Sequence, residues 1–251
     1  MDNSIKLSFC ITCKNRINQI KRTLPKNLAD NYSMKHKIDF VLIDFDSTDG
    51  LQDWLINNFE KEINEGYLKY YWTDQLPEWH LSIAKNTAHI LAKGDILVNL
   101  DCDNYTGKNG GKFVLEHMLK YGIESIIFHQ FSNTFGDGSC GRIAVSRKNF
   151  LSIGGYNEDF HPMGYQDIDI IIRLMIKGLN YIHVGTKKYN RAIPNIKEKG
   201  LENSSSKLTW GEMNTSNFIL SRHNITTGNL IANANKPHIG IIKGIFSFKE
   251  N

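Results

Sequence analysis

The chain has 251 residues, a net charge of +4, 41% hydrophobic residues and 22% charged residues. This length suits one large domain or two small ones, and the composition is that of an ordinary globular protein. The mild positive charge permits an anionic small ligand such as a nucleotide. It excludes the strongly basic surface of a nucleic-acid-binding protein.

The sequence has no apolar run of the ~20 residues that a transmembrane helix needs. The first residues, Met1 to Lys6, lack the basic start and the apolar core of a signal peptide. We therefore expect a cytoplasmic protein. The last segment, 236–251, mixes lysine with isoleucine and phenylalanine. It is expected to be a basic and apolar tail that can contact the inner face of a membrane.

Strand-like and helix-like segments alternate through the first half of the chain. Strands are predicted at 6–12, 39–44, 67–72 and 95–100, and helices at 17–28, 51–59 and 82–91. Pro25 is expected to end or kink the first helix. This alternation predicts an α/β fold with a mostly parallel sheet and helices on both of its faces.

The second half of the chain is less regular. Helices are predicted at 112–120, 168–177 and 214–231, the last interrupted near Gly228, and short strands at 125–131, 142–146 and 181–184. The polar segment 187–207 contains Pro194, Gly200 and three consecutive serines, a composition typical of a mobile loop. No linker divides the chain, so we expect a single domain over 1–235 with two halves, 1–103 and 104–235.

Cys10 and Cys13 form a CxxC pattern inside the first predicted strand. Residues three apart on a strand point to opposite faces, and no second cysteine pair completes a zinc site. Buried core cysteines are therefore favoured over redox or zinc chemistry.

Acidic pairs follow two of the predicted strands. Asp44 is the last residue of 39–44 and Asp46 lies two residues further on, while Asp101 and Asp103 come after 95–100. Ligands bind such sheets beyond the carboxyl ends of the strands, so both pairs are expected at one edge. Two carboxylates one residue apart can hold a divalent cation that also bridges phosphate oxygens. The simpler alternative is that these side chains cap the following helices.

The segment 154–169 is the most informative part of the sequence. A glycine-rich turn is followed by Asp167 and Asp169 at the start of an apolar helix. Together with Asp101 and Asp103, this arrangement suggests a metal site and a general base that face one substrate. The alternative is that the two carboxylates only compensate the helix dipole, an explanation that suits Asp169 well.

Four segments resemble glycosyltransferase motifs in the expected order, and the first three resemble those of family 2 glycosyltransferases. The segments 9–16 and 41–50 resemble the opening strand and the acidic turn of that family, and 82–95 resembles the helix and turn that precede its Asp-x-Asp motif. The segment 154–169 is similar to the carboxyl-terminal motif of galactosyltransferases and polypeptide N-acetylgalactosaminyltransferases. The resemblance covers roughly residues 5 to 190.

This resemblance implies a GT-A (Rossmann-like) fold, a UDP-sugar donor, Mn²⁺ or Mg²⁺, and an inverting mechanism. Residues 1–103 would be the nucleotide-binding half and 104–235 the acceptor-binding half. By position in the motifs, Asp167 would be the general base and Asp103 a metal ligand, with His183 as a candidate for the histidine ligand. The implied donor-binding residues are Thr12, Arg16, Asp44, Asp46, Lys85 and Asp101, and the implied acceptor-binding residues are Gly164, Tyr165, Gln166 and Asp169.

The sequence departs from the family pattern at three positions. Lys85 stands where arginine is usual, and Gln166 stands where glutamate usually precedes the base. The family's downstream histidine would fall nearer Asn190 than His183, which lies in an apolar strand typical of a core histidine. Trp79, Tyr165 and Trp210 are candidates to stack on sugar rings or to fill the core, and 187–207 is a candidate lid.

These observations predict an inverting glycosyltransferase of bacterial surface polysaccharide or glycolipid synthesis. It would move a hexose or N-acetylhexosamine from a UDP-sugar to a saccharide or lipid-linked saccharide. One alternative is a nucleotidyltransferase-like enzyme of sugar nucleotides, which would not require the segment 154–169. The other is a non-catalytic module that binds a sugar or a nucleotide.

Overall fold

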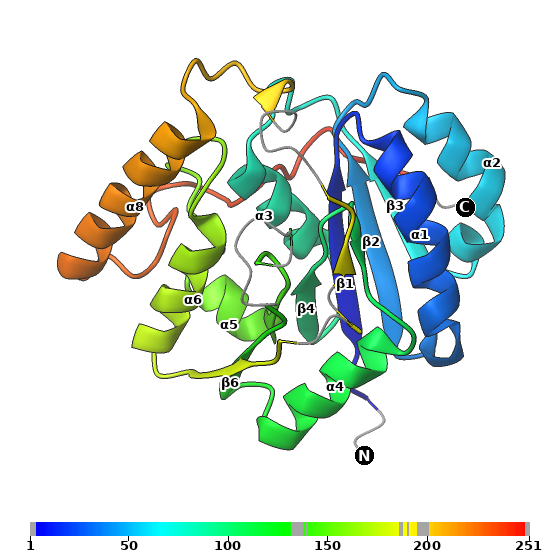
Figure 1. The fold of residues 1–251 in the computed structure, drawn as a ribbon, viewed down its shortest axis with the longest axis horizontal. Coiled ribbons are helices and arrows are strands. Elements are labelled where there is room, and N and C mark those ends of the chain that lie inside the picture. The colour runs from blue at the N-terminus through cyan, green and yellow to red at the C-terminus, as the bar shows by residue number, and fades with distance from the viewer. Residues whose placement is uncertain are drawn as a thin grey trace.

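The computed structural model describes residues 4–131, 138, 140–185, 188–189, 191–194 and 201–248. Within these residues a mixed sheet has the strand order β10-β3-β2-β1-β4-β7-β6-β8; Figure 1 labels its strands β1, β2, β3, β4 and β6. A short pair, β5 with β9, lies beside it. The strands of the large sheet are β1 (Leu7–Cys13), β2 (Ile38–Asp44), β3 (Leu68–Trp72), β4 (Ile96–Asn99), β6 (Ile126–His129), β7 (Ile143–Ser146), β8 (Asn180–His183) and β10 (Phe246–Ser247); the pair is β5 (Asn104–Tyr105) and β9 (Arg191–Ala192).

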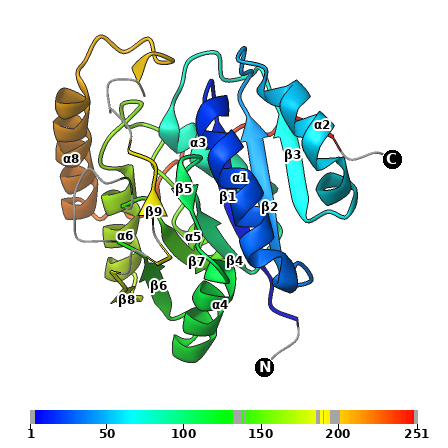
Figure 2. The ribbon, with the colours of Figure 1, turned by 45° about the vertical axis from the view of Figure 1, so that its right-hand side comes forward.

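Helices cover both faces of the sheet, as Figures 1 and 2 show. One core lies under α1 (Ile17–Asn31), α2 (Leu51–Asn64) and α4 (Gly110–Tyr121). The other lies under α3 (Leu81–Leu91), α5 (Arg147–Ser152) and α6 (Gln166–Ile176), and α8 (Trp210–Thr226) packs outside α6. A single 3₁₀ turn, η1 (Tyr32–Met34), follows α1.

The predicted fold class is confirmed, because β3, β2, β1 and β4 are parallel neighbours. The antiparallel strand β7 then joins β4 to β6, which makes the sheet mixed. Cys13 belongs to the core beneath α1, and Cys10 belongs to the core beneath α3. The expected alternation of faces along β1 therefore holds, and both thiols are buried.

Helices α1 and α8 have other bounds than the sequence predicts. Helix α1 does not end at Pro25 but runs on to Asn31. The Lys21 carbonyl has no N–H donor at Pro25, but Lys21 lies on the exposed face of the helix, where water can donate to this carbonyl instead. Helix α8 begins at Trp210, because Thr209 and Glu212 form a reciprocal capping box, and it ends before Gly228.

The segment expected to be a tail packs onto the domain. Ile239 and Ile241 lie against the core beneath α3, and Phe248 stacks on Tyr70 with ring centroids 4.6 Å apart. Strand β10 pairs antiparallel with β3 and so forms one edge of the sheet. In the described part of the chain, no helix is both long and apolar enough to cross a membrane.

Gly154 allows the C-terminal segment to approach the core. Its φ is +68°, and a Cβ added there would lie 1.9 Å from the carbonyl oxygen of Ala232. We predict that Gly154→Ala lowers the free energy of unfolding by about 2 kcal/mol or more, because strain and backbone overlap add. Chemical denaturation measures this change.

Gly211→Ala is the matched control, because a Cβ added there, at the start of α8, would lie 4.0 Å from Thr209 Oγ1, an ordinary contact distance. We expect it to leave the free energy of unfolding equal to that of the wild type or slightly higher. Equal stability of the two variants would contradict the tight packing at Gly154.

Candidate active site

A cavity of about 630 Å³ opens beyond the carboxyl ends of β1 and β4 and at the N-terminus of α6. It brings together most of the residues that the sequence analysis selects. Those that line it are Thr12, Arg16, Lys85, Asp101, Asp103, Gly164, Tyr165, Gln166 and Asp167, together with the candidate stacking residues Trp79 and Trp210.

Lys85 lies at the centre of this arrangement. It is buried in α3, with its Nζ 2.6 Å from Asp167 Oδ1 and 3.8 Å from Asp101 Oδ1. Burial alone would lower the pKa of Lys85, but Asp167 and Asp101 together raise it above its usual range. The cation therefore stays charged and holds carboxylates from two separate motifs beside each other.

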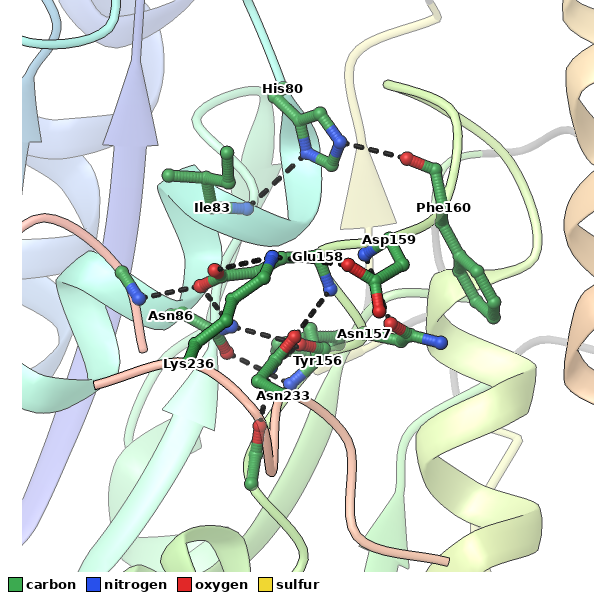
Figure 3. A network of polar contacts seen from close by, with 12 residues as sticks. His80, Ile83, Asn86, Tyr156, Asn157, Glu158, Asp159, Phe160, Asn233 and Lys236 are labelled. Carbon is green, nitrogen blue, oxygen red and sulfur yellow. Dashed lines mark hydrogen bonds and ion pairs between the residues drawn. The ribbon is translucent and has the colours of Figure 1, made fainter. Parts of the chain in front are cut away.

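A polar network behind the cavity fixes the helix that carries Lys85 (Figure 3). The Asn86 amide donates to the Tyr156 carbonyl and to Glu158 Oε1, both at 2.8 Å, and its oxygen accepts from the Tyr156 N–H. Glu158 also accepts from the Gly240 N–H and pairs with Lys236. The turn after α5 and the C-terminal segment thus hold α3 from behind.

Asp101 and Asp103 approach each other on the chain segment that follows β4. Burial and the neighbouring Asp101 raise the pKa of Asp103 to about 6. Asn99 donates to Asp101 Oδ1 at 3.0 Å, which orients that carboxylate. Two carboxylates in this position repel each other, and a divalent cation would relieve the repulsion.

The donor set fits a hard cation such as Mn²⁺ or Mg²⁺. Such ions are commonly held by one or two carboxylates together with the phosphates of a substrate. Across the residues that the structure describes, no group of three or more His, Cys, Asp or Glu side chains could hold a metal ion. Asp101 and Asp103 would therefore need oxygens of the substrate to complete the coordination shell.

Gly141 brings the two acidic motifs to one point. A Cβ added there would lie 2.7 Å from Asp101 Oδ2 and 3.3 Å from Asp167 Oδ2. Its carbonyl accepts from the Asn99 amide at 2.8 Å, which fixes the backbone in place. Because this position has no side chain, both carboxylates can face the same small volume.

The segment before α6 forms the opposite wall. Gly164 and Tyr165 both have left-handed backbone, with φ of +94° and +68°. The amide of Asn217, on α8, donates to the carbonyls of His161, Met163 and Gly164. Helix α8 therefore sets the shape of this wall.

Four of the selected residues lie outside the cavity lining. Asp44 is fully buried, with its oxygens accepting from the Ser47 N–H and the Tyr70 hydroxyl. Asp46 is exposed in the turn after β2. Asp169 is buried in an ion pair with Arg173 and accepts a hydrogen bond from the Ser221 hydroxyl. The His183 ring contacts the carbonyl of Phe131. His183 is not clustered with Asp101 and Asp103.

Three residues that line the cavity are not among those that the sequence analysis selects. Lys14, Asn203 and Asn214 all line it. Asn203 accepts from Asn15, 188 residues earlier in the chain, and its carbonyl accepts from the Trp79 N–H. Lys14 directly follows β1, so its place at a strand end is the one clue that the sequence offers. In the predicted loop 187–207, residues 187, 190 and 195–200 lie outside the described residues.

His89 supports α3 one turn beyond Lys85 and is buried against Phe150, with ring centroids 4.6 Å apart. Its Nδ1 lies 2.7 Å from the Lys85 carbonyl, so the ring donates there when it is neutral. Burial lowers the pKa of His89 to about 3. An unfolded chain would titrate near 6.5.

We predict a pH-dependent stability that His89→Phe removes. Between pH 6.5 and about 3 the unfolded state binds the proton and the folded state does not, so the stability due to neutral His89 is complete above pH 6.5 and is lost as pH falls. Relative to the variant, the wild type should lose up to about 1.4 kcal/mol per pH unit in this range. Urea unfolding at a series of pH values measures the difference. The same dependence of the free energy of unfolding on pH in the wild type and in His89→Phe would contradict the assignment.

Comparison with known proteins supports the fold. Residues 125–196 match the family model described as the N-terminal domain of galactosyltransferase. A search of curated proteins gave no match. Among solved structures, S. aureus TarS (residues 1–349) with UDP-GlcNAc has a TM-score of 0.65 at 17% identity, over 83% of this chain and 64% of that one.

Two further structures have the same fold. The mannosyltransferase PcManGT from Pyrobaculum calidifontis, in complex with GDP-Man and Mn²⁺, has a TM-score of 0.57 at 17% identity, over 73% of this chain and 56% of that one. The catalytic domain of Drosophila β1,4-galactosyltransferase 7 with xylobiose has a TM-score of 0.55 at 12% identity, over 85% of this chain and 80% of that one. The chain therefore has the GT-A fold of glycosyltransferases, as its sequence predicts. It spans less than two thirds of the length of the TarS and PcManGT chains.

Proposed function

We propose that the protein is a glycosyltransferase that moves a hexose or N-acetylhexosamine from a UDP-sugar to a saccharide acceptor. The observation that carries this proposal is the convergence of Asp101, Asp103 and Asp167 on one cavity, with Lys85 between two of them. Each carboxylate suits a different part of the reaction. The fold shared with glycosyltransferases that bind nucleotide sugars supports this division of roles.

The donor would lie along the ends of β1 and β4. Thr12, Arg16, Lys85 and Asp101 line this side of the cavity and would bind the nucleotide and its diphosphate. Asp103 and Asp101 would hold Mn²⁺ or Mg²⁺. That cation, when bound, would act as a Lewis acid that offsets the charge of the leaving nucleoside diphosphate.

Asp167 would act as the general base. A sugar hydroxyl is a weak nucleophile, so a carboxylate within hydrogen-bond reach must accept its proton as it attacks the anomeric carbon. The ion pair with Lys85 holds Asp167 in one orientation toward the cavity. Attack from the face opposite the leaving group would invert the anomeric configuration.

The acceptor would lie against the wall before α6. Gly164, Tyr165 and Gln166 line that wall, and Trp79 and Trp210 offer apolar ring faces within the same cavity. Such a surface suits a saccharide, free or linked to a lipid. We propose surface polysaccharide or glycolipid synthesis in a bacterium as the setting for this reaction.

A donor screen tests the binding part of the proposal. We expect one UDP-sugar, at about 100 times its Kd and with Mn²⁺, to raise the melting temperature by about 5 to 10 °C, because ligand binding adds roughly 2.7 kcal/mol of stability. Without Mn²⁺ the shift should be much smaller. No shift with any UDP-, GDP- or dTDP-sugar would contradict the proposal.

Asp167→Asn tests the catalytic part. The variant should lose about 10²- to 10⁴-fold in turnover, the usual effect of removing a general base, while its affinity for the donor stays near that of the wild type. Donor titration and a coupled assay of nucleoside diphosphate release measure the two quantities.

Asp169→Asn is the matched control two residues away. It breaks a buried ion pair with Arg173, so it should lower the free energy of unfolding by about 3 kcal/mol. Its folded fraction should keep its turnover, because Asp169 does not line the cavity. Full activity of Asp167→Asn would refute its role as the base.

A further inference from the structure

Two cysteines, Cys13 and Cys102, lie beside each other next to the acidic pair. Cys13 is the last residue of β1, and Cys102 stands between Asp101 and Asp103 on the segment that follows β4. Both are free thiols, Cys13 buried and Cys102 half-buried. The proposed reaction uses neither of them.

The register of the two strands places these cysteines at the same level. Strands β1 and β4 are parallel, and Cys10 and Asn99 are their last paired residues. Cys13 and Cys102 each come three residues later. The Leu100 N–H donates to the Cys10 carbonyl at 2.9 Å, so the pairing continues beyond the end of β4. Neighbouring strands lie about 4.8 Å apart, which is within the range of Cα separations, about 4.4 to 6.8 Å, that a disulfide spans.

The two side chains also lie on the same face of the sheet. Ile96 and Val98 of β4 belong to the core beneath α1, and Leu100 continues this alternation. Cys102 is the next residue in the series and packs against the core to which Cys13 belongs. Burial, and after it contact with the Cys102 thiol, raises the pKa of Cys13. The two sulfur atoms are therefore neighbours.

An oxidant would reach Cys102 before Cys13. Cys102 lines the cavity, whereas Cys13 is only 1% exposed. Hydrogen peroxide would convert the Cys102 thiol to a sulfenic acid and release one water. The Cys13 sulfur would then attack the Cys102 sulfur, and the hydroxyl would leave with the Cys13 proton as a second water. The two thiols thus lose two electrons, which reduce one peroxide to two waters.

Formation of this bond would displace the acidic pair. An S–S bond is about 2.0 Å long, shorter than the separation of two thiols in contact. Cys13 is held in β1 between β2 and β4, whereas Cys102 lies in a turn. The turn is therefore the part that moves, and Asp101 and Asp103 are its neighbours on either side.

We propose that Cys13 and Cys102 form a reversible disulfide that weakens the binding of the divalent cation and the nucleotide. The disulfide depends on the two cysteines alone, and its effect on binding rests on the proposed function. A thiol reductant would reverse it by exchange. The enzyme would then bind its donor fully only when this pair is reduced.

Peptide mapping of the full chain after treatment with hydrogen peroxide tests the disulfide. We expect one linked pair of peptides that carries Cys13 and Cys102, lighter by two hydrogen atoms than the separate peptides and lost on addition of dithiothreitol. Cys140 also lines the cavity and is the competing partner. A link between Cys102 and Cys140, or oxidation of Cys102 to a sulfinic acid with no link to Cys13, would overturn the inference.

Calorimetry with UDP and Mn²⁺ tests the effect on binding. Oxidation should weaken the affinity of the wild type about tenfold or more, the usual effect of disturbing a metal site, and dithiothreitol should restore it. Cys102→Ser should keep its own affinity through the same treatment, with Cys102→Ala in its place if that variant does not fold. Cys140→Ser is the matched control and should lose affinity on oxidation as the wild type does.

The outcomes separate this inference from the proposed function. A linked protein that binds UDP and Mn²⁺ as tightly as the reduced one would overturn the regulatory effect. A loss of affinity in oxidised Cys102→Ser would assign the effect to another residue and overturn it as well. A reduced wild type that does not bind UDP with Mn²⁺ would overturn the proposed function, and the peptide map would still decide whether the disulfide forms.

Discussion

The ion pair between Lys85 and Asp167 is the interaction on which the arrangement of the cavity depends. Lys85 comes from a helix in the first half of the chain, and Asp167 begins a helix in the second half. A buried ammonium group is costly unless it is paired or hydrogen-bonded, so pairing with Asp167 stabilises the arrangement in which the two motifs meet at Lys85. Asp101 Oδ1 lies 3.8 Å from Lys85 Nζ, so the segment after β4 also pairs with this cation.

The rest of the fold keeps Lys85 in this position. Asn86 and His89 fix α3 to the turn after α5 and to the core. The C-terminal segment approaches closely at Gly154 and contacts Glu158 through Gly240 and Lys236. A segment near the end of the sequence thus supports a residue of the first half. For this reason we expect truncation of that segment to affect the cavity as well as the sheet edge that it forms.

The sequence predicts the parts of this structure that depend on local patterns. The strand and helix alternation of the first half, the opposite faces of Cys10 and Cys13, and the position of Asp101 and Asp103 at a strand end all follow from spacing. The course of the C-terminal segment does not, because its lysines and isoleucines suit a free tail as well as an edge strand. The burial of Asp44 and Asp169 cannot be predicted from local patterns either, because their partners Tyr70 and Ser221 are 26 and 52 residues away in the sequence.

The measurement that tests the central claim most directly is the identity of the products formed from a bound UDP-sugar with Mn²⁺. Phosphorus NMR and mass spectrometry would follow the nucleotide and the sugar together. The proposed chemistry predicts one UDP for each sugar that is transferred to an acceptor or to water, with no UMP and no pyrophosphate. UMP with a sugar phosphate, or release of pyrophosphate, would show that a different bond is broken and would contradict glycosyl transfer.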